Sequence, residues 1–203
     1  AMIGIIDYGL SNLRSVSGAI EKLGHRCVIS SDVKVLSDCQ KLILPGVGAF
    51  GDGMKNLRDR NLIEPLNDMV LGSKKPILGI CLGAQLMCRE SYEFGHWPGL
   101  NWLDAAVLKM NANGMRVPHV GWNDCLRVKD CSLYEELPER MLYYFVHSYF
   151  IQPDDHSIVT GECEYGGKFT ASVQKDNISA TQFHPEKSQI YGLKVLKNFI
   201  EKA

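Results

Sequence analysis

The sequence lacks several patterns that mark whole classes of protein. Its seven cysteines include no CxxC pair, the spacing typical of zinc sites and thioredoxin-like redox motifs. Its 22 Lys and Arg residues form no basic tract, and they balance 23 Asp and Glu residues to a formal net charge of -1. Nothing electrostatic therefore points to nucleic acid or an anionic membrane as a partner. Nothing in the sequence indicates a metal ion or an organic cofactor.

Long apolar runs are also missing. None approaches the roughly 20 residues that a helix needs to cross a bilayer. Residues 2–7 lack the basic region and small-residue cleavage pattern of a signal peptide, and we interpret them as a first strand. An odd, scattered set of cysteines fits a reducing compartment. The sequence therefore predicts a cytoplasmic protein.

Short apolar runs alternate with helical periodicity in the first half of the chain. Strands are predicted at residues 2–6, 26–30, 41–44 and 76–80. Helices are predicted at residues 13–23, ended by Gly24, at about 52–71 with a break near Asn61 or Pro65, and at 82–90. Strands that alternate with helices favour a parallel sheet covered on both faces.

The second half is richer in β-like runs, from Trp102 to about Phe183. They lie at residues 141–147, 158–163, 169–173 and 178–183. Ser188 is then predicted to cap a last helix, whose apolar face carries Leu193, Leu196, Phe199 and Ile200. No repeat or linker is visible. The sequence thus predicts one α/β domain over residues 1–203. We expect three layers, with a mixed, mostly parallel central sheet between helices and extra antiparallel strands in the second half.

One cysteine lies between two glycines at a predicted strand-to-helix junction. Residues 79–83 read Gly-Ile-Cys-Leu-Gly, the G-x-nucleophile-x-G layout of a nucleophile elbow. The glycines allow the tight turn, and aligned peptide dipoles at the helix start favour a Cys81 thiolate. The N–H of Leu82 is expected to face a developing oxyanion. The alternative, a small buried core residue, is our interpretation of the other six cysteines.

A histidine and a carboxylate follow near the end of the chain. Residues 182–186 read Gln-Phe-His-Pro-Glu, between a β-like run and the last helix. A nucleophilic thiol needs a base that takes its proton and returns it to the leaving group, and histidine suits both steps. A nearby carboxylate can orient the imidazole and stabilise its charged form. We therefore predict His184 as the base and Glu186 as its orienting group, and interpret the other five histidines as structural.

A glycine-rich loop follows the third predicted strand. Residues 44–50 read Leu-Pro-Gly-Val-Gly-Ala-Phe, and the two glycines that bracket Val47 permit a peptide N–H to face a ligand. Val47 and Gly48 are therefore candidates for an oxyanion hole. A plain strand-ending turn is the alternative. Phosphate binding does not fit, because no Lys-Ser or Lys-Thr pair follows.

These three motifs, in this order, resemble the triad-type glutamine amidotransferases, which share a flavodoxin-like fold. The resemblance is greatest to the family of glutaminase subunits of imidazole glycerol phosphate synthase, and it covers nearly the whole chain. It is carried by residues 6–9 (IDYG), 44–48 (LPGVG), 79–85 (GICLGAQ), 118–123 (PHVGWN), 144–149 (YFVHSY) and 182–188 (QFHPEKS). Residues 93–102 depart from the family's usual acidic, glycine-rich segment.

The resemblance implies the chemistry and further site residues. Cys81 would form a γ-glutamyl thioester from L-glutamine and release ammonia, which passes to a (β/α)8-barrel cyclase subunit in histidine biosynthesis. The positions that match glutamine-binding residues of the family are Gln85, Glu93, Ser148 and Tyr149. The positions that match partner-facing residues are Asn12, Trp122, Asn123, Tyr144 and Lys187. Core packing is the alternative role for Trp122 and Tyr144.

Three other functions stay open at this level. A paralogous glutaminase subunit could supply ammonia to a sugar-modifying amidotransferase of surface polysaccharide synthesis. A non-catalytic subunit could bind and regulate the barrel, although the complete set of Cys81, His184 and Glu186 argues against it. A peptidase or γ-glutamyl hydrolase could share the fold, but residues 118–123 and 144–149 favour the synthase subunit.

Overall fold

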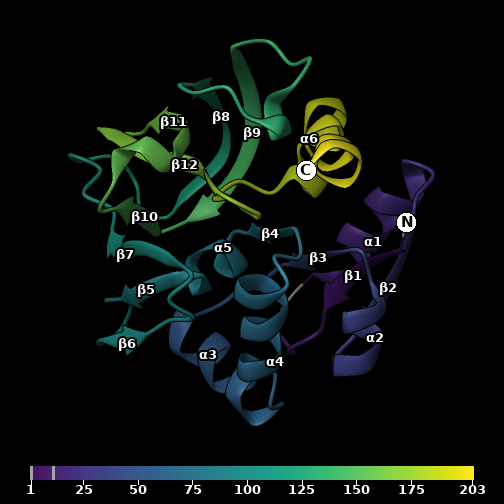
Figure 1. Ribbon diagram of the computed structural model, residues 1–203. Helices are drawn as coiled ribbons and strands as arrows, with labels where there is room; N and C mark the ends of the chain where they lie inside the picture. The colour runs from purple at the N-terminus through teal and green to yellow at the C-terminus, as the bar shows by residue number, and fades with distance from the viewer. Residues whose placement is uncertain (1, 11) are drawn as a thin grey trace.

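One mixed sheet runs through the protein, whose computed structural model describes residues 2–10 and 12–203 (Figure 1). Its strands are β1 (Met2–Ile6), β2 (Arg26–Ser30), β3 (Lys41–Leu44), β4 (Ile77–Ile80), β5 (Cys88–Ser91), β6 (Trp97–Pro98), β7 (Leu103–Lys109), β8 (His119–Arg127), β9 (Arg140–His147), β10 (Tyr149–Pro153), β11 (Val159–Glu164), β12 (Lys168–Lys175) and β13 (Ile178–Thr181). The α-helices are α1 (Leu13–Lys22), α2 (Val33–Asp38), α3 (Phe50–Asp59), α4 (Ile63–Asn67), α5 (Leu82–Leu86) and α6 (Gln189–Lys202). Short turns are a π-helix, η1 (Asp68–Gly72), and the 3-10 helices η2 (Ser132–Tyr134), η3 (His156–Ile158) and η4 (Pro185–Lys187).

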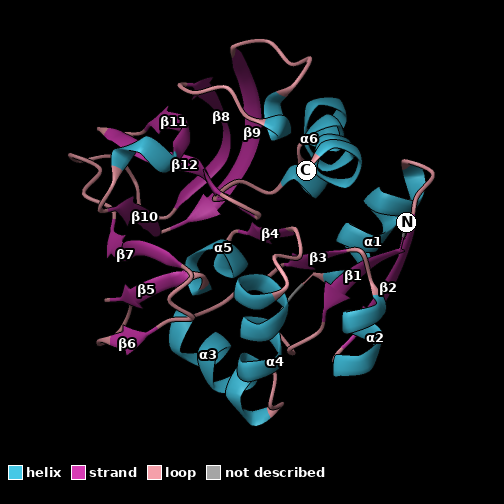
Figure 2. Ribbon diagram, in the orientation of Figure 1, coloured by secondary structure: helices cyan, strands magenta, loops and turns pink. Residues whose placement is uncertain are grey.

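Five adjacent strands, in the order β2-β1-β3-β4-β13, run parallel to one another. This is the strand order of flavodoxin-like sheets. Beyond β13 the sheet continues mainly with antiparallel pairs, and β11, β8 and β9 branch from β12 (Figure 2). The α/β class and the mixed sheet with added antiparallel strands are confirmed. The prediction of a mostly parallel sheet holds for the first five strands but not for the strands that follow them.

The two faces of the parallel strands are covered by different helices, as period-2 alternation requires. Helices α1 and α6 cover one face, and α2, α3, α4 and α5 cover the other (Figure 1). In β3, Leu42 and Leu44 pack with α3 and α4, whereas Ile43 packs with α1 and α6. Both faces of the inner strands β1, β3 and β4 are therefore buried, which explains their apolar runs, whereas the edge strand β2 is partly exposed.

The helical stretch after β3 breaks where the sequence allowed a choice. Asn61 takes a left-handed φ of 53° between α3 and α4, and Asn tolerates this conformation better than most residues. Pro65 lies instead within the first turn of α4, where its missing N–H costs no helical hydrogen bond. The break is therefore at Asn61. The six-residue helix α2, whose N-terminus the Asp32 side chain caps, was not predicted.

The helix predicted at residues 82–90 is wrong beyond Leu86. Helix α5 ends there, and the chain turns into strand β5, which pairs with β6 and β7. The Leu86 carbonyl accepts a hydrogen bond from the N–H of Leu100, and the Cys88 carbonyl accepts one from Asn101. These long-range bonds take the carbonyls that a longer helix would have used. Tertiary pairing has overridden the local periodicity.

No helix in the described part of the chain has both the length and the apolar character that spanning a membrane requires.

Two glycines in helices offer a matched test of how tightly the sheet edge is packed. A Cβ on Gly83 in α5 would lie 1.8 Å from the Leu44 carbonyl oxygen, whereas a Cβ on Gly18 in α1 would meet nothing within 4 Å. Ala favours helix over Gly by up to about 1 kcal/mol. We therefore expect Gly18→Ala to stabilise the fold by roughly 0.5–1 kcal/mol. Gly83→Ala should destabilise it by about 2 kcal/mol or more, because the backbone must move.

Urea unfolding of the two variants, followed by circular dichroism, measures these free energies. Equal effects of the same sign at both positions would contradict this description of the packing.

Candidate functional site

The predicted catalytic residues lie where the parallel strands end. Cys81 follows β4, His184 follows β13 by three residues, and the loop with Val47 follows β3. Strands β3, β4 and β13 are neighbours in the sheet, so their carboxyl ends meet at one edge. In open α/β sheets this edge is where ligands bind.

Cys81 occupies a strained turn between β4 and α5. Its φ of 54° and ψ of -113° lie in a region that non-glycine residues seldom adopt. A Cβ on Gly79 would lie 2.8 Å from the Cα of Ala84, and one on Gly83 would overlap the Leu44 carbonyl. Both flanking glycines are therefore required for the close approach of strand and helix. This geometry matches a nucleophile elbow.

His184 and Glu186 form a buried pair next to this turn. His184 Nδ1 lies 3.1 Å from Glu186 Oε2, and both side chains are 2% exposed. Burial by itself lowers the pKa of His184, but the Cys81 thiol and the Glu186 carboxylate outweigh it and raise the pKa to about 10. The other ring nitrogen, Nε2, is buried and has no hydrogen-bond partner among the described residues. An oriented imidazole with one unpaired nitrogen beside a thiol can transfer a proton to and from sulfur.

The backbone of His184 is fixed to strand β9. Its N–H donates to the Tyr144 carbonyl at 2.9 Å. The Ser188 hydroxyl donates to the His184 carbonyl at 2.6 Å and accepts from the Tyr144 N–H at 2.9 Å. Ser188 precedes α6 as predicted, but the prediction that its side chain caps the helix is wrong, because the hydroxyl is used to hold His184 against β9.

The glycine-rich loop is held by hydrogen bonds of its own. The Val47 N–H donates to the Leu10 carbonyl at 2.9 Å, and the Leu82 N–H donates to the Gly46 carbonyl at 3.2 Å. The hydroxyl of the buried Tyr8 donates to the Pro45 carbonyl at 2.6 Å. In this conformation a loop carbonyl therefore occupies the Leu82 N–H, and its role in an oxyanion hole stays a prediction. Buried N–H groups pair with the nearest carbonyl, and the loop supplies one.

A cavity of about 230 Å³ opens at Cys81. All four residues predicted to bind substrate line it, together with both glycine-loop candidates. The lining is Val47, Gly48, Cys81, Leu82, Gln85, Glu93, Val146, His147, Ser148 and Tyr149. The structure thus brings together residues from three separate motifs and Glu93, and the cavity is large enough for a small amino acid.

Glu93 enters this cavity from the loop between β5 and β6. One carboxylate oxygen accepts a hydrogen bond from the Phe50 N–H at 2.6 Å, at the N-terminus of α3. Burial raises the pKa of Glu93, and the Phe50 N–H opposes this rise. The loop belongs to the segment that departs from the family pattern, yet it still delivers a carboxylate to the cavity.

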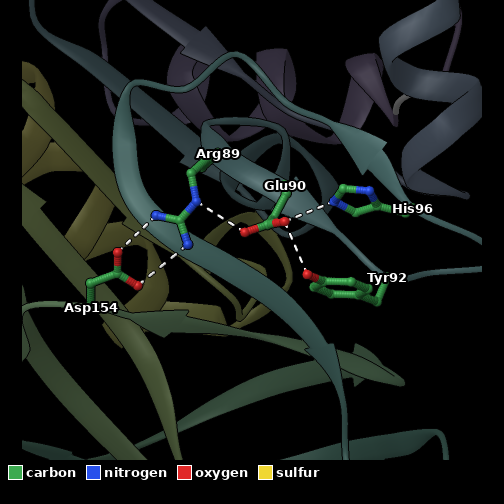
Figure 3. Close-up of polar contacts among 5 residues, drawn as sticks. All are labelled: Arg89, Glu90, Tyr92, His96 and Asp154. Carbon is green, nitrogen blue, oxygen red and sulfur yellow. Dashed lines mark hydrogen bonds and ion pairs between the residues drawn. The ribbon is translucent and has the colours of Figure 1, made fainter.

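An exposed ionic network anchors that loop to the rest of the sheet (Figure 3). The Glu90 carboxylate accepts from Arg89 at 3.0 Å, from the Tyr92 hydroxyl at 3.0 Å and from His96 at 2.7 Å. Arg89 also donates to Asp154, just past β10, at 2.7 Å. The hydrogen bond from His96 is the largest of the contributions that lower the pKa of Glu90.

Sequence reasoning missed three buried polar residues beside the site. Gln182 Nε2 lies 3.7 Å from the Cys81 sulfur, and Gln182 is 1% exposed. His147 lines the cavity and is hydrogen bonded to His119. Gln182 stands two residues before His184, in the motif already singled out, and this position was the available signal. No periodicity distinguishes the two histidines from ordinary core residues.

The five residues matched to partner-facing positions do not form one uniform surface. Trp122 is 47% exposed, so its alternative role as a core residue is wrong. Its ring meets that of the half-buried Tyr144 on β9 edge to face, with centroids 5.9 Å apart. Asn12 and Lys187 are partly exposed. The Asn123 side chain is instead bonded to His119 and to the Glu164 carbonyl.

The class of protein is shown by its sequence family. Residues 4–203 match the family model described as glutamine amidotransferase class-I, and the chain belongs to this family. The solved structures that it resembles are of the same kind. A chain described as a glutamine amidotransferase superposes with a TM-score of 0.78 at 21% identity, covering 99% of this chain and 98% of that one. PurLQS from Thermotoga maritima gives 0.76 at 19% identity, with 98% and 97% covered.

Relatives of higher identity belong to one particular subunit type. Imidazole glycerol phosphate synthase subunit HisH of Geobacter sulfurreducens is 46% identical and that of Aquifex aeolicus is 48% identical. The alignments cover 98% of this chain in both cases, with 98% and 96% of the relatives. Subunit HisH 2 of Methanococcus maripaludis is 43% identical, with both chains fully covered.

The raised pKa of His184 can be tested directly. The folded-state pKa of about 10 lies above the unfolded value of about 6.5, so folding favours the protonated imidazole. The stability that this pair contributes is fully present below about pH 6.5 and is lost as the pH rises through 10. NMR titration of ring-labelled histidine should show His184 still protonated at pH 8.

Cys81→Ala should lower the His184 pKa, because it removes a group that raises it. Cys88→Ala, at a fully buried thiol in the core, is the matched control and should leave it unchanged. An unchanged His184 titration in Cys81→Ala would refute the coupling between the thiol and the imidazole.

Proposed function

We propose that this chain is the glutaminase subunit of an imidazole glycerol phosphate synthase. The observation that carries the proposal is the arrangement at the carboxyl edge of the sheet. A cysteine on a strained elbow opens into a cavity, and a buried imidazole–carboxylate pair lies beside it. The relatives at 43–48% identity supply the pathway, histidine biosynthesis. Seven free cysteines support a cytoplasmic location.

The proposed reaction uses Cys81 as the nucleophile. The thiolate attacks the side-chain amide carbon of glutamine and forms a C–S bond, and the amide oxygen takes the negative charge. His184, protonated and oriented by Glu186, gives its proton to the leaving nitrogen as the C–N bond breaks. Ammonia departs and a γ-glutamyl thioester remains. His184 then takes a proton from water, whose oxygen attacks the thioester to release glutamate and the Cys81 thiolate.

The cavity supplies contacts for the amino-acid end of glutamine. Glu93 is the acidic residue that lines the cavity, and its carboxylate is the proposed partner of the substrate's ammonium group. Ser148, between β9 and β10, and Tyr149, the first residue of β10, also line the cavity. They can bond the substrate carboxylate through N–H or hydroxyl groups. Gln85 lies at the base, where it donates to the Tyr149 carbonyl at 3.1 Å.

Stabilisation of the oxyanion requires a rearrangement of the glycine loop. The N–H groups of Leu82 and Val47 are the proposed donors, and both are bonded to backbone carbonyls in this structure. Each must exchange that bond for one to the substrate oxygen. Oxyanion-hole donors are worth about 2.7–4 kcal/mol of transition-state stabilisation, so the loop conformation controls the rate. Gly46 and Gly48 give the peptide between them freedom to turn.

A (β/α)8-barrel cyclase subunit is the proposed partner, and an exposed apolar surface marks where it would bind. Exposed residues that line a groove at the start of α6 are Trp122, Leu142, Ile190 and Tyr191, and Val120 is exposed on the same strand as Trp122. Exposed aromatic residues of this kind dominate protein–protein interfaces. Tyr144, whose carbonyl holds His184, pairs with Trp122 across β8 and β9. Asn12, Asn123 and Lys187 keep their proposed place at this interface.

The recipient of the ammonia separates this proposal from its alternatives. A sugar-pathway paralogue would use the same glutaminase chemistry, and neighbouring polysaccharide genes would identify it. The high identity to synthase subunits favours the histidine pathway. A purely regulatory subunit would have no use for the buried His184–Glu186 pair beside Cys81.

Glutamate release from glutamine tests the proposed function. Glutamine hydrolysis by this subunit alone should be slow, because both proposed oxyanion donors are bonded to backbone carbonyls. Addition of a cyclase subunit from one of the related synthases, with its nucleotide ligand, should raise the rate by at least about 100-fold, the effect of gaining an oxyanion donor. Cys81→Ala should lower the stimulated rate at least about 10⁴-fold.

The control is Cys88→Ala, which should keep wild-type stimulation. If Cys81→Ala retained activity, Cys81 could not be the nucleophile. If no cyclase subunit stimulated the wild type, the assignment to this synthase would fail.

A further inference from the structure

Two buried histidines form a directed hydrogen-bond chain next to the cavity. His119 Nδ1 lies 3.0 Å from His147 Nε2, and His147 Nδ1 lies 2.9 Å from the Tyr149 carbonyl oxygen. At the outer end, Asn123 Nδ2 lies 3.1 Å from His119 Nε2. His119 and His147 are 3% and 6% exposed. Every ring nitrogen of the pair is therefore hydrogen bonded.

The Tyr149 carbonyl fixes the direction of this chain because a carbonyl can only accept. His147 must carry its proton on Nδ1, which leaves Nε2 as an acceptor. His119 must then donate from Nδ1 and accept from the Asn123 amide at Nε2. Both rings are neutral, and burial lowers the pKa of His119 to about 4 and of His147 to about 3. These hydrogen bonds keep this direction at neutral pH.

The same carbonyl begins a second chain that ends at the sulfur. Gln85 Nε2 donates to the Tyr149 carbonyl and to Gln182 Oε1, both at 3.1 Å. Gln182 must therefore turn its amide nitrogen towards Cys81, and Nε2 lies 3.7 Å from the sulfur. Gln85 and Gln182 are 5% and 1% exposed, so neither amide has solvent as a substitute. An N–H donor directed at sulfur stabilises negative charge that develops on it.

We propose that His119 and His147 are positioning residues for Cys81. They hold the Tyr149 carbonyl at the point from which Gln85 and Gln182 aim an N–H at the sulfur. Packing alone would not require two imidazoles here. Phe145 packs against His119 and Phe169 against His147, so apolar rings are the usual occupants of this part of the core. At its outer end the Asn123 amide also donates to the Glu164 carbonyl at 2.9 Å, which holds this end of the hydrogen-bond chain against β11. This inference rests on the proposed function only in taking Cys81 as the nucleophile.

Two substitutions at His119 separate positioning from packing. His119→Phe keeps a ring among the surrounding aromatics but leaves His147 Nε2 without its donor. His119→Asn has a smaller side chain that packs less well, yet its amide can donate from nearly the place of the ring Nδ1. Positioning therefore predicts that Asn is the more active variant and Phe the more stable one. A packing role predicts that activity follows stability.

The first readout is the rate at which iodoacetamide alkylates Cys81 in the full chain at pH 7, followed by mass spectrometry of the peptide with residues 79–83. His119→Phe should slow it about fivefold, the factor that corresponds to one lost net hydrogen bond, and His119→Asn should lie within twofold of wild type. Glutamate release with the cyclase subunit should show the same order in kcat with little change in KM. Melting temperatures give the stability order.

The control is Tyr165→Phe, which removes a hydroxyl from the ring that packs on His119, with centroids 4.1 Å apart. It leaves the hydrogen bonds from His119 to the Tyr149 carbonyl intact. It should match the wild type. The inference is overturned if His119→Phe reacts within twofold of wild type, or if His119→Asn is no faster than His119→Phe. Because alkylation needs no substrate or partner, the result stands even if the wild type releases no glutamate.

Discussion

The site depends on one strained residue, Cys81, whose backbone turns sharply between β4 and α5. Such a conformation costs about 1–3 kcal/mol and persists only where the surroundings enforce it. Here the β4 strand is buried on both faces, and the backbone of α5 approaches so closely that Gly79 and Gly83 admit no side chain. The core therefore stabilises the turn, and the turn presents the sulfur to the cavity. The position of the thiol follows from the packing of the sheet.

Burial also strengthens the electrostatic interactions between the polar groups around the sulfur. The His184–Glu186 pair is almost fully removed from water, and the backbone of His184 is tied to Tyr144 on β9. In such surroundings a charged pair is screened little, and small displacements change proton affinities. The Tyr8 hydroxyl and the backbone hold the glycine loop in the same region. Movements of β9 or of the loop would therefore reach the chemistry directly, which fits a site that works with a partner.

The sequence predicted the parallel half of the fold well, because strands buried on both faces are uninterrupted apolar runs. Strands β1, β2 and β3 have the predicted bounds. Helix α5 was predicted too long, since β5 pairs with two later strands, β6 and β7, which the local periodicity of residues 82–90 does not reveal. The cysteine elbow and the His184 motif are local patterns and could be read directly. The bonds of the Leu82 N–H and the polar chain through Gln182 depend on which segments meet in space, and no local pattern encodes that.

Covalent trapping can show whether Cys81 is the nucleophile of a glutamine-binding cavity. The chain would be treated with the glutamine analogue 6-diazo-5-oxo-L-norleucine and its cysteines mapped by mass spectrometry. We expect a single adduct, on Cys81, that forms more slowly when glutamine competes. An adduct on any of the six other cysteines instead, or labelling of Cys81 that glutamine does not slow, would contradict it.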